Sequence, residues 1–379
     1  MKELLTRNEC SAMRGIAILA IMLHNYCHWL RGIVRENEYT WQLSKADQLW
    51  QYILNPDEQL PLHLVSFFGH YGVPVFLFLS GFGLVKKYEQ GKLPEVGLWR
   101  FVRYNYLKLF RIFIVGFVIF TMLDAFTPGM HRYTWTAVVA MLGMFANLLE
   151  DPSHVVWPGP YWYFSITLQL YIFYRLIYYR WRHWGVVVGM IALCWLWQLS
   201  CQDDAVLLER LRYNLIGGML PFGMGILMAR FIPTLGTKNS STSEAAKPSA
   251  HVGNQTFFDK RSGKAERPNW EYLLALLLAV VLIVVLSFSF QGWLWVPMLI
   301  VVGTIALVKL MPEWMLKYSV WLGSISAAIF VTHPLVRKIF VRPYLYDDLY
   351  AGLLLYIVAT LFLSWLMKKV IDQLPSPKL

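Results

Sequence analysis

The stretch "RGIAILAIMLHNYCHWL", Arg14–Leu30, is apolar enough to cross a membrane, yet it starts on an arginine and contains two histidines, His24 and His28. About 20 mostly apolar residues are needed for a spanning helix. Ionisable groups at membrane depth are costly, and they usually face a bundle interior or a water-filled cavity. We therefore expect a membrane helix whose polar side chains line such a cavity.

Helix geometry separates these polar residues into two levels. At about 1.5 Å per residue, His24 lies about 15 Å beyond Arg14 along the axis, and His28 follows one turn later on the same face. Neutral imidazole suits proton transfer near neutral pH. Two plainer alternatives stay open, namely that Arg14 reaches lipid phosphates by snorkelling and that His28 is interfacial.

The rest of the chain extends this pattern to an all-α, polytopic integral-membrane helical bundle. Of the 379 residues, 57% are hydrophobic and only 15% are charged, whereas soluble domains carry about 25% charged residues. The sequence predicts about ten transmembrane helices, near residues 12–30, 62–85, 107–127, 161–179, 184–200, 213–231, 270–289, 293–311, 318–336 and 349–367. We interpret the apolar stretch 133–149 as a re-entrant or interfacial helix.

Basic residues set the expected orientation. The net charge is +11, and most Lys and Arg clusters fall on one side if the N-terminus is inside, so both termini are expected in the cytoplasm. Such charge favours contact with anionic membrane lipid, and without a recognition motif we expect no nucleic-acid partner. Arg337, Lys338 and Arg342 do not fit this topology: either they hold an anionic substrate or lipid, or their helix is misplaced.

Residues 233–269 differ from the rest of the chain, because small, polar and basic residues dominate them. This composition predicts a disordered cytoplasmic linker between helices six and seven, interrupting a single domain over residues 1–379. The four cysteines form no CxxC pair, so neither a disulfide framework nor a metal site is predicted.

Further polar and aromatic candidates lie along the predicted spans. Arg103 and Arg111 stand at the entrance of the third, either as a positive-inside anchor or as a phosphate clamp. Trp162 and Tyr163 open the fourth, either as an interfacial belt or as a platform for a carbohydrate. His333 lies in the outer half of the ninth, at the same level as His24.

Taken in order, these elements resemble the acyltransferase-3 family of integral-membrane acyltransferases. The resemblance is carried by "RGIAILAIMLHN", "GHYGVPVFLFLSGFGL", "YWYFSITLQLYIFY" and "ISAAIFVTHP". Two features depart from the family pattern. Nine residues separate Arg14 from His24 where ten are usual, which leaves His28 as a competitor, and Thr167 and Leu168 stand where many members have a glutamate. A carboxylate that would orient the histidine is therefore not identified.

The resemblance implies O-acyl transfer, most often of acetyl from acetyl-CoA, to a hydroxyl of a glycan or lipid-linked acceptor. It implies a catalytic His24 and a donor-binding Arg14, with His24 acting as a general base or through an acyl-imidazole. We extend these roles to His333 as a second catalytic residue and to Arg103 and Arg111 on the donor side.

On the acceptor side we place Trp162 and Tyr163. No bound cofactor is expected, only acetyl-CoA or another acyl-CoA as co-substrate, and the expected location is the plasma (inner) membrane of a bacterium. The sequence leaves open whether the acyl group is acetyl or succinyl. Two alternative functions remain: a transporter or flippase for a glycan or lipid-linked sugar, and a glycan polymerase.

Overall fold

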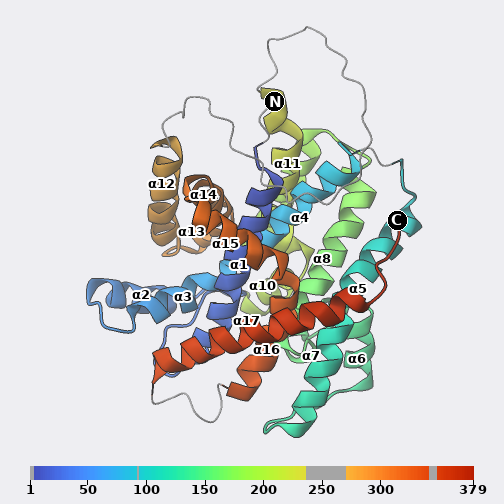
Figure 1. Cartoon of the computed structure of the whole chain (residues 1–379). Coiled ribbons are helices and arrows are strands. Elements are labelled where there is room, and N and C mark those ends of the chain that lie inside the picture. The colour runs from blue at the N-terminus through green and yellow to red at the C-terminus, as the bar shows by residue number, and fades with distance from the viewer. Residues whose placement is uncertain (1–3, 92–93, 236–269, 341–347) are drawn as a thin grey trace.

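The structure is a computed structural model that describes residues 4–91, 94–235, 270–340 and 348–379. Within these ranges the chain is all-helical and no strand occurs, as the sequence predicts. Figure 1 shows α1 (Arg7–Cys27) near the middle of the bundle. The expected linker begins at residue 233, but residues 233–235 belong to the end of α11, and the remainder lies outside the described residues.

Fewer of the described helices than expected qualify by length and composition as membrane spans. In the described ranges, four helical segments are long and apolar enough to cross a membrane, or up to six if each of two bent helix pairs is one span. The four are α1, α3–α4 (Leu60–Phe68 and Gly72–Tyr88), α5 (Leu98–Phe126) and α17 (Leu349–Gln373). The expected count of about ten is thus not confirmed.

The two bent pairs are α10 (Ala205–Arg212) with α11 (Leu215–Leu235), and α15 (Glu313–Ser324) with α16 (Ser326–Phe340). Three shorter apolar helices occupy further predicted windows: α9 (Trp184–Leu199), α12 (Trp270–Leu286) and α14 (Val296–Leu310). The remaining window holds α8 (Trp162–Phe173), which continues into the π-helical turn η4 (Tyr174–Tyr178).

The remaining elements are short. They are α2 (Leu43–Leu54), α6 (Trp135–Leu142), α7 (Pro152–Val155), α13 (Phe290–Trp293), and the 3₁₀ turns η1 (Gly69–Tyr71), η2 (Ala146–Leu148) and η3 (Gly159–Tyr161). The eight residues of α6 extend only about 12 Å. Since this is far less than the hydrocarbon thickness, α6 agrees with a re-entrant or interfacial interpretation of residues 133–149.

The start of α1 is fixed by local sequence. The Thr6 hydroxyl accepts the Glu9 backbone N–H, and the Glu9 carboxylate accepts the Thr6 N–H, which makes a capping box. The same carboxylate pairs with Lys309 at 2.9 Å and so ties α1 to α14. Further along, a Cβ at Gly15 would collide with the Ser319 carbonyl, so this glycine permits the close approach of α1 to α15.

The other end of α1 is brought against η1 in the same way. A Cβ at Gly69 would lie 2.6 Å from the Ala20 carbonyl oxygen and 2.7 Å from His24 Cβ. Because such distances are too short for a real side chain, the missing Cβ lets η1 lie directly on α1. On the opposite side, the pair α15–α16 bends by 71°, and α16 packs on α1, α5 and α17.

Candidate active site

A cavity of about 180 Å³ lies beside the Cys27 end of α1. Its wall combines α1, the loop from α1 to α2, η1, the 157–162 segment and α16. Its principal polar side chains are His24, Asn25, His28, Glu36, His70 and Arg337. A smaller cavity of about 40 Å³ shares Glu38, Tyr39, His70 and Trp162 with it. The fold therefore gathers ionisable groups from four separate segments at one end of α1.

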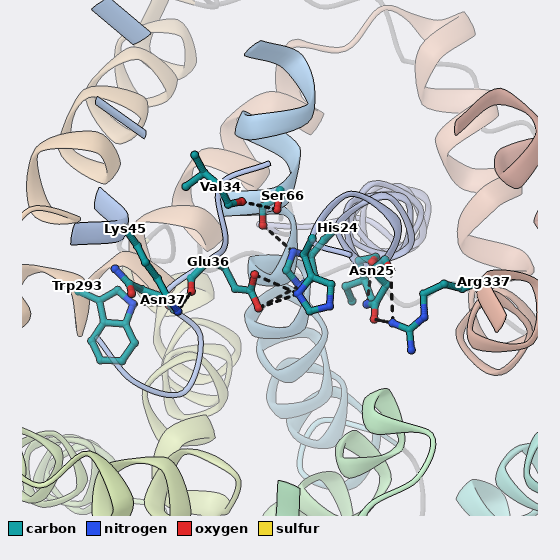
Figure 2. Close-up of polar contacts among 11 residues, drawn as sticks. His24, Asn25, Val34, Glu36, Asn37, Lys45, Ser66, Trp293 and Arg337 are labelled. Atoms are coloured by element: carbon teal, nitrogen blue, oxygen red, sulfur yellow. Dashed lines mark hydrogen bonds and ion pairs between the residues drawn. The ribbon is translucent and has the colours of Figure 1, made fainter. Parts of the chain in front are cut away.

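His24 is held in one orientation by the backbone of α3. Its side chain is buried, and its Nδ1 lies 2.7 Å from the Ser66 carbonyl oxygen. A carbonyl can only accept, so Nδ1 carries the proton and donates it to this bond. Neutral His24 then keeps its lone pair on Nε2, the atom that faces Glu36 (Figure 2).

Glu36, in the loop after α1, is a carboxylate next to His24 and His28 that the sequence did not reveal. His28 Nδ1 donates to its two carboxylate oxygens at 3.1 and 3.2 Å, and His24 Nε2 lies 3.9 Å from Oε1. Burial by itself raises the pKa of the Glu36 carboxyl. The hydrogen bond from His28 and the charges of His24 and His28 outweigh burial, so that the pKa of Glu36 lies well below its usual range.

The loop that carries Glu36 is fastened at several points. Ser66 Oγ donates to the Val34 carbonyl at 2.7 Å, and Lys45 Nζ donates to the Glu36 carbonyl at 2.8 Å. Trp293 Nε1 donates to the Asn37 carbonyl at 2.7 Å (Figure 2). Trp293 comes from α13, 256 residues along the chain, so the position of Glu36 depends on distant parts of the sequence.

A second carboxyl, Glu38, stands in a different electrostatic environment two residues away. Burial, and then the neighbouring charge of Glu36, raises its pKa to about 8. The adjacent backbone is held by Arg212, whose Nε donates to the Glu38 carbonyl at 2.7 Å. One short loop therefore presents one carboxylate that is charged at neutral pH and one carboxyl that keeps its proton there.

His70 is a third histidine at this site. It lies on η1, its ring centroid is 5.5 Å from that of His24, and it is 4% exposed. Its Nε2 has no hydrogen-bond partner among the described residues. One feature of the sequence indicates this placement: Gly69 directly precedes His70, and glycine allows close helix approach.

Comparison with known protein families identifies the family of this chain. The profile of the acyltransferase-3 family, described as an acyltransferase domain, matches residues 8–369, nearly the whole chain. The chain belongs to this acyltransferase family. No match was found among curated proteins or among solved structures. Membership makes the protein an acyltransferase, and together with its long apolar helices it indicates an integral membrane protein.

The structure of this acyltransferase places His333 outside the cavity wall. Its side chain is fully buried, and its Nδ1 donates to the Ile329 carbonyl at 3.0 Å within α16. Arg337, one turn later, lines the cavity instead. The face of α16 that meets the cavity carries Phe330 and Arg337, and His333 is not among the residues that line the cavity.

The basic pair in the last turn of α16, Arg337 and Lys338, is accounted for by local contacts, whereas Arg342 lies outside the described residues. An Arg337 NH1–Asn25 Oδ1 hydrogen bond of 3.1 Å crosses to α1, and the guanidinium lies 5.0 Å from the Trp29 ring centroid. Lys338 pairs with the fully buried carboxylate of Asp124 on α5. These two cations are therefore parts of the bundle's interior contacts.

The three arginines expected on the donor side are not in the cavity. Arg14 lies seven residues into α1 and is exposed, and its charge acts on the Tyr163 hydroxyl. Arg103 is exposed on α5. Arg111 donates to the Ile371 carbonyl at 2.6 and 3.0 Å and to Ser376 Oγ at 2.6 Å, so its guanidinium caps the end of α17.

The two aromatic candidates are separated by their direction on α8. Trp162 lines the cavity, where its ring lies 5.7 Å from Tyr39 and 5.8 Å from Tyr213. Tyr163 points elsewhere and packs against Phe330 at 5.3 Å. Since Trp162 is buried in the bundle, it does not belong to a lipid-facing belt.

Proposed function

We propose that the protein moves an acyl group, most often acetyl from acetyl-CoA, to a hydroxyl of a glycan or other cell-envelope acceptor, with His24 as the general base. The observation that carries this proposal is the pairing of His24 Nδ1 with the Ser66 carbonyl. It leaves a basic Nε2 inside a cavity that has a carboxylate 3.9 Å away.

In the proposed step, His24 Nε2 takes the proton of the acceptor hydroxyl while the hydroxyl oxygen attacks the thioester carbonyl carbon. The C–S bond then breaks, and the proton on Nε2 passes to the CoA thiolate, which restores neutral His24. Glu36 stabilises the imidazolium that forms between these events, because an opposite charge nearby favours the protonated ring.

His28 is proposed to position Glu36 rather than to act on the substrate. Its Nδ1 is engaged with both oxygens of that carboxylate, whereas the Nε2 of His24 faces the same group at 3.9 Å. This division of roles favours His24 over His28 as the base. For His333 we propose no catalytic role, because it lies behind the cavity wall.

The donor is proposed to approach from the Arg7 end of α1, with both termini in the cytoplasm of a bacterial cell. Arg14 and Arg103 are the exposed cations that suit CoA phosphates. Arg111 is withdrawn from this role by its contacts with α17. On the acceptor side, the flat face of Trp162 in the cavity wall suits the C–H surface of a sugar.

The proposal is tested with purified protein in lipid nanodiscs and radiolabelled acetyl-CoA, with and without a hydroxyl acceptor. We expect hydrolysis or transfer, reduced about 10²–10⁴-fold in His24→Ala. His154→Ala is the matched control, since His154 is an exposed histidine paired with Asp151 away from the cavity. Wild-type activity in His24→Ala would remove His24 from the mechanism, and inactivity with every acyl-CoA would refute acyl transfer.

A further inference from the structure

We propose that His24, His28 and Glu36 form a binding site for a divalent transition-metal ion such as Zn²⁺, and that the bound ion occupies the lone pair which His24 uses as a base. The sequence predicted no metal site, because its four cysteines form no CxxC pair, and it did not reveal the path of the loop between His24 and Glu36. The three side chains meet at the wall of one cavity.

The distances between the donor atoms suit a small coordination sphere. One ligand atom from each of the three residues lies within 4.8 Å of the other two. His28 Nδ1 is 3.1 Å from Glu36 Oε1, and His24 Nε2 is 3.9 Å from the same oxygen. Around a tetrahedral Zn²⁺ with bonds of about 2.0–2.1 Å, neighbouring ligands stand about 3.3 Å apart. Shifts below 1 Å would therefore complete the sphere.

A second observation points to a ligand here. His70 lines the same cavity, is 4% exposed, and has an Nε2 without a hydrogen-bond partner among the described residues. A buried polar atom without a partner is costly. With its ring centroid 5.5 Å from that of His24, His70 is placed to supply a fourth ligand or to bond a metal-bound water.

The surroundings of His24 and Glu36 also suit metal ligation. Metal-binding histidines commonly donate their other ring N–H to a backbone carbonyl or carboxylate, which fixes the ring. His24 Nδ1 makes such a bond to the Ser66 carbonyl at 2.7 Å. Ser66 and Lys45 in turn fasten the loop that carries Glu36 (Figure 2), so two of the three ligands are held in place before an ion arrives.

The charges around the cavity partly offset one another. Arg337 lines it and opposes a cation, but its guanidinium is directed to Asn25 and to the ring of Trp29. Glu36 contributes a full negative charge next to the histidines, and Glu38 adds a second carboxyl to the same wall. Access is available through His28, whose side chain is 24% exposed.

The binding test uses the full chain in lipid nanodiscs, stripped with a chelator and then dialysed against ⁶⁵Zn²⁺. We expect one tightly bound ion per chain, with the affinity at least about tenfold weaker in His28→Ala and in Glu36→Gln. Glu36→Gln preserves the size of the side chain, so it protects the test against a misfolded His28→Ala. The control His154→Ala should bind as the wild type does.

Co²⁺ absorption gives an independent readout, because a tetrahedral site produces intense visible bands that the two variants should lose. Unchanged affinity in both variants, or no binding above that of His24→Ala, would overturn the proposal. The inhibitory arm rests on the proposed acyl transfer: Zn²⁺ should suppress it, and chelator should restore it. Metal binding by a protein that transfers no acyl group even after the chelator has removed the metal would refute the function and leave the site, whereas acyl transfer without metal binding would do the reverse.

Discussion

The two ends of α1 differ in how far the fold gathers their polar residues. At the Cys27 end, ionisable side chains from four segments meet around one cavity of about 180 Å³. At the Arg7 end, Arg14 and Arg103 are exposed, and Arg111 caps α17. Polar residues that look equivalent in the sequence thus form a shared site at one end and separate contacts at the other.

The depth at which a polar residue lies and its contact with other polar residues are thus determined by different parts of the structure. The depth of a residue follows from its position along a single helix. Convergence depends on loops and neighbouring helices, such as the Gly69 contact with α1 and the Trp293 bond that holds the loop before α2. We therefore expect the rate of acyl transfer to depend on the residues at the Cys27 end of α1, and the affinity for the acyl donor to depend on those at the Arg7 end.

The largest effect is expected from Glu36→Gln. It removes the charge that stabilises protonated His24, and we expect kcat for acyl transfer to fall about 10–10²-fold with little change in the KM for acyl-CoA. The measurement is steady-state kinetics in nanodiscs, with His154→Ala as control. A rise in KM at unchanged kcat would show that Glu36 acts in donor binding instead.

A comparable effect, on stability, is expected from Gly69→Ala. Its new Cβ would meet the Ala20 carbonyl at 2.6 Å, and such overpacking costs about 1–3 kcal/mol. Gly83 is the matched control, because no atom of the described residues lies within 4 Å of a Cβ built there. Thermal unfolding should show a lower Tm for Gly69→Ala and a Tm near wild type for Gly83→Ala; equal Tm values would contradict the close packing of η1 on α1.

At the Arg7 end of α1, we expect about a tenfold change in the KM for acyl-CoA. Arg14→Gln is expected to raise the KM for acyl-CoA about tenfold, since one charge-assisted bond to phosphate contributes roughly 1.5–3 kcal/mol. Arg111→Gln should instead lower the Tm, because it uncaps α17, and leave KM unchanged. If both variants raised KM equally, Arg111 would belong to the donor site after all.

The smallest effect is a pH dependence from Glu38. Its folded-state pKa is about 8, against an ordinary value of 4.5, because of burial. Between these pH values the folded protein holds a proton that the unfolded chain releases, so stability falls as the pH rises through this window. Glu38→Gln should flatten the decline in Tm from pH 5 to pH 8, and an unchanged slope would assign the decline to other groups.

The sequence predicted the helices better than it predicted which of their side chains come together at the cavity. It predicted an all-α bundle and Trp162 at the start of its helix. It could not predict Glu36, because the loop path depends on Lys45, Ser66 and Trp293. It placed His333 among the catalytic residues, whereas the cavity face of α16 carries Arg337. Helical periodicity gives a residue's depth, but the rotation of a helix is set by its neighbours.

The assignment of His24 as the general base is tested most directly by comparing His24→Gln with His28→Gln in one acyl-transfer assay. The variants remove neighbouring imidazoles whose ring centroids are 5.0 Å apart, so each is the other's control for general damage to the cavity. We predict that His24→Gln abolishes transfer, whereas His28→Gln, which disturbs only the positioning of Glu36, retains measurable turnover. Full turnover in His24→Gln, or abolition only in His28→Gln, would contradict the assignment of His24 as the base.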